Sequence, residues 1–123
     1  MTIKVLVVED DKISSKLINI ILEEAGCTVE LASSGVDALK LYFANNYDLV
    51  FMDVGLPDIS GITITRLIRA YSANKVRVRI VALTAHVNNS YRIACLAAGM
   101  DAFLTKPIDA QHVQDIIDNF REG

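Results

Sequence analysis

The sequence has none of the features that mark a protein bound to nucleic acid or to a membrane. It contains no run of Lys or Arg, and its 12 basic and 15 acidic residues give a net charge of -3, so we expect no direct contact with nucleic acid. No apolar stretch approaches the length of a membrane span. The first apolar run is too short, and too soon broken by acids, for a signal peptide. We therefore expect no direct membrane contact and a cytoplasmic location.

Cysteine is also scarce, and linkers are absent. Cys27 and Cys95 lie far apart, without the spacing of metal ligands, and among apolar or small residues, so we expect reduced, packed thiols. There is no internal repeat or low-complexity segment. With 123 residues, 52% of them hydrophobic and 22% charged, the chain suits one packed domain over residues 1–123 and no second catalytic domain.

What the sequence does contain is a set of apolar runs that each end abruptly in polar residues. The runs at residues 5–8, 49–52, 80–83 and 102–104 are followed by Glu9-Asp10-Asp11, Asp53, Thr84 and Thr105-Lys106-Pro107, respectively. Such runs predict strands that are buried on both faces, and a shorter strand is expected at residues 27–31. If these strands are parallel, all the polar residues meet at one edge, where α/β sheets bind their ligands.

Segments with helical spacing of apolar residues lie between the strands. The first carries Ile13, Leu17, Ile20 and Ile21; the second, with a capping box at Ser34 and Asp37, carries Val36, Leu39 and Phe43; three more fall within residues 60–71, 91–98 and 109–120. Five strands alternating with five helices predict a parallel sheet covered on both faces. We expect a flavodoxin-like, doubly wound α/β fold with strand order 2-1-3-4-5, in which the first and third strands flank the switch point.

In this order the carboxylates of Glu9, Asp10 and Asp53 share one pocket. Three close carboxylates repel each other unless a cation holds them, and hard oxygen ligands in a small open site suit Mg²⁺, or Mn²⁺ in its place. The alternative for residues 9–11 is a cap and charge complement for the first helix. Asp53 alone would be an ordinary strand-end acid, so the joint placement is what favours a metal site.

Thr84 and Lys106 add a hydroxyl group and an ammonium group to this edge. A carboxylate can attack a phosphoryl group when a metal and a cation neutralise the phosphoryl oxygens, which predicts an aspartyl phosphate on Asp53. Taken alone, Thr84 could be a helix cap and Lys106 a solvated loop lysine. Their positions at matching strand ends favour the phosphorylation site.

These residues carry a resemblance to response-regulator receiver domains over essentially the whole chain. The matching motifs are Val-Val-Glu-Asp-Asp, Met-Asp-Val-Gly-Leu-Pro with Gly61 downstream, Ala-Leu-Thr-Ala and Leu-Thr-Lys-Pro-Ile. The resemblance implies the following roles: Asp53 as phosphoacceptor, Mg²⁺ held by Glu9, Asp10, Asp53 and the Gly55 backbone carbonyl, Lys106 as phosphate partner, and Thr84 and Phe103 as switch residues. Glu9 departs from the Asp that the family often has at its position.

The resemblance also implies partners. The stretch from Ala82 to Ile108 looks most like receivers attached to hybrid sensor histidine kinases, so the phosphoryl donor or acceptor would be a histidine on a kinase or a phosphotransfer domain. The implied docking surface is the first helix around Ile13, Leu17 and Ile20, with the loop after Lys106. Such a domain is a phosphoacceptor that promotes its own phosphorylation and dephosphorylation rather than a conventional enzyme, although a hybrid kinase parent would be one.

Three alternatives remain at this point. Phosphatases with an aspartate nucleophile resemble a pattern with a second acid two residues after the nucleophile, where this chain has Gly55. A flavin or nucleotide binder needs a cradle rich in glycine and serine after the first strand, where this chain has acids. A receiver-like interaction module that is never phosphorylated has no residue-level support.

His86, beside the proposed site, could contact the phosphoryl group or be an ordinary loop histidine, and His112 is expected at the surface.

Overall fold

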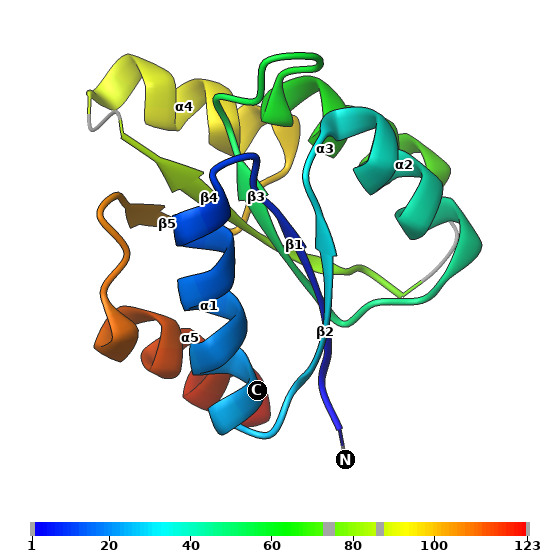
Figure 1. Cartoon of the computed structure of the whole chain (residues 1–123). Helices are drawn as coiled ribbons and strands as arrows, with labels where there is room; N and C mark the ends of the chain where they lie inside the picture. Colours follow the sequence, from blue (N-terminus) through cyan, green and yellow to red (C-terminus); the bar gives the residue numbers. More distant parts are fainter. Residues whose placement is uncertain (1, 73–75, 86–87, 123) are drawn as a thin grey trace.

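The computed structural model describes residues 2–72, 76–85 and 88–122, which form one five-stranded parallel sheet with helices on both faces (Figure 1). The strands lie in the order β2-β1-β3-β4-β5. Their bounds are β1 Lys4–Val8, β2 Thr28–Ala32, β3 Leu49–Asp53, β4 Arg79–Thr84 and β5 Ala102–Thr105. The helices are α1 Lys12–Glu24, α2 Gly35–Ala44, α3 Gly61–Tyr71, α4 Asn89–Ala98 and α5 Ala110–Glu122. The predicted fold and strand order are confirmed.

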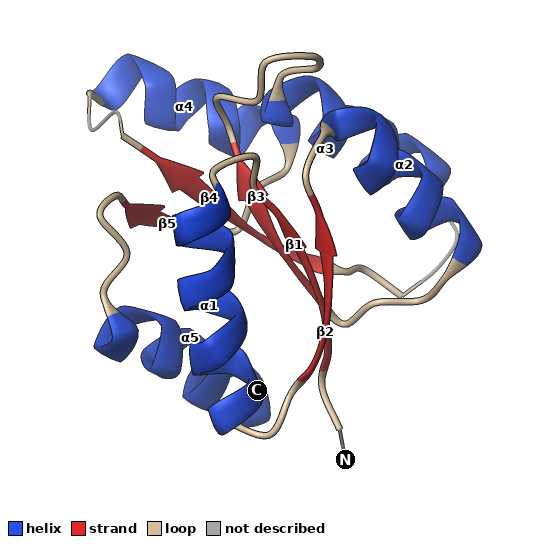
Figure 2. Cartoon of the chain, in the orientation of Figure 1, coloured by secondary structure: helices blue, strands red, loops and turns tan. Residues whose placement is uncertain are grey.

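The central strands are apolar apart from their terminal residues because both of their faces are covered (Figure 2). Along β1, Leu6 and Val8 pack on the side of α2, α3 and α4, whereas Val5 and Val7 pack on the side of α1 and α5. Side chains alternate between the faces of a strand, so each β1 residue joins one of two separate cores. This arrangement explains the unbroken apolar runs of the sequence.

The segments of α1 and α2 are helical as predicted, but several of their apolar residues lie away from the core. In α1 the buried residues are Ile18 and Leu22, whereas Ile13, Leu17 and Ile20 are exposed. In α2 the buried residues include Ala38 and Tyr42, whereas Val36 and Phe43 are exposed; Leu39 lies between these extremes, partly buried against the core. Both helices are apolar on more than one face. The exposure of Ile13, Leu17 and Ile20 agrees with the docking surface that the resemblance implies, and Ile21 is partly buried against the core.

Other local predictions agree with the structure. The Ser34 hydroxyl caps α2 by accepting the Asp37 backbone N–H at 3.1 Å, and α5 buries Val113 and Ile117 as its spacing predicts. Both cysteines are free and buried. Among the described residues, no helix is both long and apolar enough to span a membrane.

Candidate functional site

The predicted acids meet at the carboxyl edge of the sheet, between β1 and β3. Val8 pairs with Met52 in the parallel register, so the residues that follow them, Glu9 and Asp53, lie beside each other. Carboxylate oxygens of Glu9, Asp10 and Asp53 all lie within 4.8 Å of one another. Glu9 is 1% exposed and Asp53 4% exposed, while Asp10 is open to solvent. The edge therefore gathers three acids, two of them almost inaccessible to water.

The run of acids after β1 divides between two roles. Asp11 caps α1, because its Oδ2 accepts the Ser14 backbone N–H at 2.9 Å. The helix-cap alternative is thus correct for Asp11 alone. Glu9 instead turns inward, where its Oε2 accepts the Asp11 backbone N–H at 3.2 Å. Its Oε1 makes no hydrogen bond within the described part of the chain.

Lys106 brings a positive charge to these acids from the end of β5. Its backbone N–H donates to the Thr84 carbonyl oxygen at 2.8 Å, which fixes the start of the loop against β4. Its Nζ lies 2.7 Å from Glu9 Oε1 and 3.3 Å from Asp53 Oδ2. The first contact is an ion pair whose direction does not meet hydrogen-bond geometry. One ammonium group therefore serves two buried carboxyl groups.

Burial and crowding separate the acidities of these groups. Burial, followed by hydrogen bonding to Asp53, raises the pKa of Glu9 to about 7. Burial also opposes ionisation of Asp53, but hydrogen bonds from Glu9 and the Gly55 N–H outweigh it and lower the pKa of Asp53. Burial disfavours the charged form of Lys106, yet its two acidic partners raise its pKa. Without a metal, burial and the neighbouring Asp53 therefore favour the protonated form of Glu9, whereas the ionised form of Asp53 is favoured.

This donor set fits a divalent cation such as Mg²⁺. The ligands are hard carboxylate oxygens, partly open to water through Asp10, as Mg²⁺ prefers. Glu9 Oε1 already has the Lys106 ammonium group at 2.7 Å, so the fit to a cation rests on the three carboxylates, whose oxygens lie within 4.8 Å of one another. Gly55 adjoins the cluster, because its N–H donates to Asp53 Oδ1 at 3.0 Å, and it is exposed.

The two predicted switch residues lie on the neighbouring strands. Thr84 is the last residue of β4 and is buried; its predecessor Leu83 pairs with Asp53 across β3 and β4. Phe103 lies in β5 and is partly buried against the core beneath α4. The Arg92 guanidinium of α4 stands 5.0 Å from the centre of its ring, a contact that the sequence did not indicate.

The remaining candidates fall outside this cluster. Ile13, Leu17 and Ile20 lie on exposed positions of α1, and Ile13 is 80% exposed. His112 is exposed on α5, as expected. His86, for which two interpretations were left open, lies outside the described residues.

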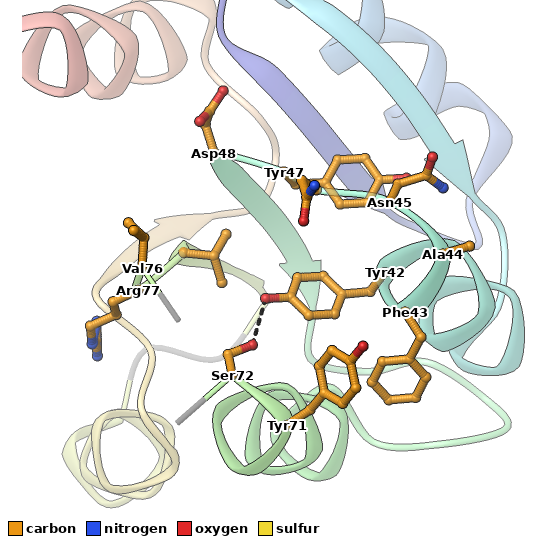
Figure 3. A pocket seen from close by; sticks show the side chains of 12 residues that line it. Tyr42, Phe43, Ala44, Asn45, Tyr47, Asp48, Tyr71, Ser72, Val76 and Arg77 are labelled. Atoms are coloured by element: carbon orange, nitrogen blue, oxygen red, sulfur yellow. Dashed lines mark hydrogen bonds between the residues drawn. The ribbon is translucent and has the colours of Figure 1, made fainter. Parts of the chain in front are cut away.

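A cavity of about 660 Å³ lies at the other end of the sheet (Figure 3). Its wall includes Asp48 and Val78, which directly precede β3 and β4, whereas the acids follow β1 and end β3. Inside it, the Tyr42 and Ser72 hydroxyl groups are 2.8 Å apart, within hydrogen-bonding distance. It is therefore separate from the acidic site.

One further residue near the acids was missed at the sequence level. Asp58, in the loop after β3, accepts the backbone N–H groups of Gly35 and Val36 at 2.9 and 3.0 Å. The sequence marked it only as part of a turn. Its partners are more than 20 positions away, so no local pattern could have identified them.

The strand order and the switch-point position of the acids define a doubly wound α/β protein of the flavodoxin-like class. The family model of the response regulator receiver domain matches residues 5–118. The chain therefore belongs to the response regulator receiver family, as its motifs indicated.

Relatives and solved structures agree with this assignment. Over 122 residues the chain is 36% identical to hybrid signal transduction histidine kinase L of Dictyostelium discoideum, covering 95% of this chain and 7% of that protein. It is 34% identical over 113 residues to transcription factor SKN7 of Saccharomyces cerevisiae, covering 92% and 18%. The chain thus spans less than a fifth of either relative.

Among solved structures, the chemotaxis response regulator CheY4 of Vibrio cholerae superposes with a TM-score of 0.90 at 25% identity, covering 98% of this chain and 99% of that one. A putative response regulator of Chloroflexus aurantiacus gives the same TM-score at 31% identity, with both chains fully covered. The likeness therefore extends over the whole described fold.

Proposed function

We propose that this receiver domain accepts a phosphoryl group on Asp53 from a phosphohistidine, in a reaction that requires Mg²⁺. The observation that carries the proposal is the environment of Asp53: a buried carboxylate, 3.3 Å from the Lys106 ammonium group and close to two further acids. Family membership supports the same chemistry. The donor would be a histidine kinase or a phosphotransfer domain, and we place the reaction in the cytoplasm.

Each residue of the cluster has a defined task in this scheme. Glu9, Asp10, Asp53 and the Gly55 carbonyl would hold the cation, and when bound Mg²⁺ would neutralise charge on the phosphoryl oxygens. An oxygen of Asp53 attacks phosphorus as the P–N bond to the donor histidine breaks, and the imidazole leaves with that electron pair. Lys106 stabilises the charge that develops on the phosphoryl group. Glu9 would serve as a ligand in its ionised form.

We assign the switch to Thr84 and Phe103. The phosphoryl group adds about -1.5 to -2 charges, so the Thr84 hydroxyl would donate to a phosphoryl oxygen and Phe103 would turn into the space that Thr84 leaves. This movement would change the face formed by α4, β5 and α5. One charge-assisted hydrogen bond supplies about 1.5 to 3 kcal/mol, whereas reversing a 1:99 equilibrium needs about 5.5 kcal/mol. Either Lys106 and the cation supply the rest, or the unphosphorylated ensemble already visits the active form.

Substitution of Thr84 tests this coupling. In Thr84→Ala, we expect the amide chemical shifts of α4 and α5 to change much less on phosphorylation than in the parent. If the phosphorylated and resting states of the variant differ as much as those of the parent, the coupling through Thr84 is wrong.

We assign partner docking to the exposed apolar positions Ile13, Leu17 and Ile20 of α1, with the loop after Lys106. Three large apolar side chains on one exposed helix form a candidate contact surface. Pro107 in that loop is exposed.

Intact mass after incubation with acetyl phosphate tests the proposed function. We expect a phosphoryl adduct on the parent in the presence of Mg²⁺, and none with EDTA or in Asp53→Asn. Absence of an adduct under every condition would favour an interaction module that is never phosphorylated. Steady turnover of small phosphomonoesters would favour a phosphatase instead.

A further inference from the structure

The loop between β3 and α3, residues 54–60, is held at both of its ends. The Val54 N–H donates to the Leu83 carbonyl oxygen at 3.1 Å, and the Gly61 N–H donates to the Val54 carbonyl oxygen at 3.2 Å. At Gly61 the loop passes so close to β3 that a Cβ atom would collide with the Asp53 carbonyl oxygen. These contacts fix where the loop leaves and re-enters the fold.

Within the loop, Asp58 provides an attachment to a different element, α2. Its two carboxylate oxygens accept the Gly35 and Val36 backbone N–H groups at 2.9 and 3.0 Å. The Gly35 and Val36 N–H groups lower the pKa of Asp58, so the side chain is an anion at the positive end of a helix. The third N–H of this helix start is satisfied separately by the Ser34 hydroxyl. Asp58 is therefore a bridge between the loop and α2, additional to the helix's own cap.

Close packing reinforces the bridge. A Cβ atom on Gly35 would lie 2.9 Å from Ile59 Cβ and 2.9 Å from Ile64 Cδ1, distances that real Cβ atoms do not reach. The absence of a side chain at Gly35 thus allows the loop to rest directly on the first residue of α2. The hydrogen bonds of Asp58 then set the position of the loop along the helix.

Gly55 is the residue whose position depends on these attachments. It is exposed and lies between Val54 and Leu56, which are both buried in the same core. Its N–H donates to Asp53 Oδ1, and it has no side chain to restrict its backbone. Gly55 stands three positions before Asp58 in the same loop, so the backbone path that positions its carbonyl group includes the segment that Asp58 attaches to α2.

We propose that Asp58 is a positioning residue: by joining the loop of residues 54–60 to the start of α2, it holds the Gly55 carbonyl where a divalent cation beside Asp53 can use it. The inference rests on the proposed function, because it assumes that Gly55 is a metal ligand. Groups that orient metal ligands without touching the metal commonly change metal affinity about 10- to 100-fold when they are removed. Asp58→Ala should therefore weaken Mg²⁺ binding by about 10-fold.

Calorimetric titration with Mg²⁺ tests the inference on the parent, Asp58→Ala and Asp58→Asn. The Asn side chain keeps one acceptor oxygen but presents an NH₂ group to the second N–H, so its affinity should fall between the other two. Amide spectra of the metal-free proteins give a second readout. The Gly55 resonance should shift or broaden in Asp58→Ala, because the loop has lost its attachment.

Ser34→Ala and Asp37→Ala are the matched controls. Ser34→Ala removes the cap of the same helix at a cost of about 1 kcal/mol, and Asp37→Ala removes an acid from the same first turn; neither loosens the loop. Both should bind Mg²⁺ within about two-fold of the parent, a margin of only about 0.4 kcal/mol.

Two results would overturn the inference while leaving the proposed function in place: unchanged Mg²⁺ affinity in Asp58→Ala, or an equal loss of affinity in Ser34→Ala. A parent protein that binds no Mg²⁺ would overturn the inference and the proposed function together.

Discussion

The charged groups at the two ends of the parallel strands are paired differently. The amino edge is the side of the sheet where the strands begin, and the carboxyl edge is the side where they end. At the amino edge, Asp101 Oδ1 accepts from Arg77 at 2.6 Å, and its Oδ2 accepts from Arg69 and from the Ile80 backbone N–H at 3.0 and 2.9 Å. Arg69 also donates to the carbonyl oxygens of Val78 and Gly99. Both oxygens of this acid therefore have partners within the fold.

At the carboxyl edge, the charges are left incompletely matched. Two buried acids, Glu9 and Asp53, share the Lys106 ammonium group, and a third acid, Asp10, lies beside them. The raised pKa of Glu9 records this imbalance, since burial and its acidic neighbour favour the protonated form. The comparison indicates that the Arg69–Asp101 network at the amino edge joins α3, α4 and β4, whereas the acids at the carboxyl edge can still bind a cation.

The largest effect on stability should come from Arg69→Met at the amino edge. The change removes the Arg69 donors to the carbonyl oxygens of Val78 and Gly99, and leaves the partly buried Asp101 with fewer partners. We expect a loss of about 2 to 3 kcal/mol in the free energy of unfolding, measured by urea denaturation. Arg66→Met, at an exposed position of the same helix, is the control and should cost less than about 0.5 kcal/mol. Equal losses in both variants would remove the structural role assigned to this network.

A smaller effect, of opposite sign, is expected at the carboxyl edge. The pKa of Glu9 is about 7 in the folded state against 4.5 for the free side chain, so the folded state binds more protons between these values. Without divalent cations, the free energy of unfolding should therefore fall as pH rises from 4.5 to 7. Asp53 does not contribute in this window, because its lowered pKa places its effect below 3.8.

Glu9→Gln should remove this pH dependence. In EDTA at high pH, we expect the variant to be more stable than the parent by on the order of 1 kcal/mol, with the difference vanishing at low pH. Saturating Mg²⁺ should reverse the order, because the parent gains about 2.7 kcal/mol at 100 times its dissociation constant. Thermal unfolding across pH, with and without Mg²⁺, measures both effects. If the free energy of unfolding of the parent rises through this pH window, burial of ionised Glu9 does not destabilise the fold.

Arg92→Ala should change the free-energy difference between the Phe103 rotamers by at most about 1 kcal/mol. The guanidinium lies 5.0 Å from the centre of the Phe103 ring, and such contacts contribute about 0.5 to 1 kcal/mol at exposed sites. We expect the resting populations of the Phe103 rotamers to shift by about two- to five-fold, as measured by side-chain NMR couplings. Arg66→Ala, on a different helix, should leave the rotamers unchanged. Identical rotamer populations in Arg92→Ala and the parent would show that Arg92 does not restrain the ring.

The smallest effect on folding belongs to Ile13→Ala. Ile13 is 80% exposed, so the free energy of unfolding should change by less than about 0.5 kcal/mol. Phosphorylation by acetyl phosphate should also stay at the parent rate. Transfer from a phosphorylated histidine phosphotransfer domain should slow several-fold, and an unchanged transfer rate would remove Ile13 from the docking surface.

The sequence predicts the features of this molecule that follow from the pattern of each strand and from the parallel arrangement of the strands. Unbroken apolar runs that end in polar residues were sufficient to predict four strands and the clustering of Glu9 with Asp53, because parallel strands end at one edge. The spacing of apolar residues did not distinguish the two sides of α1: both the stripe of Ile13 and the stripe of Ile18 are apolar, and only the packing against the sheet and α5 selects the buried one.

Contacts between distant residues could not be predicted in the same way. Asp58 meets α2 across 22 and 23 positions, and Arg69 meets Asp101 across 32. Each of these side chains has an ordinary local setting, an acid in a turn or a basic residue near the end of a helix. Their partners follow from the three-dimensional arrangement alone.

Amide chemical-shift mapping during titration with Mg²⁺, followed by beryllofluoride, tests the difference between the two edges most directly. We predict that Mg²⁺ perturbs residues around Glu9, Asp10, Asp53 and Gly55, that beryllofluoride extends the changes to Thr84 and Lys106, and that the surroundings of Arg69 and Asp101 stay unchanged. Perturbations centred on the amino edge, or none at either edge, would contradict the account.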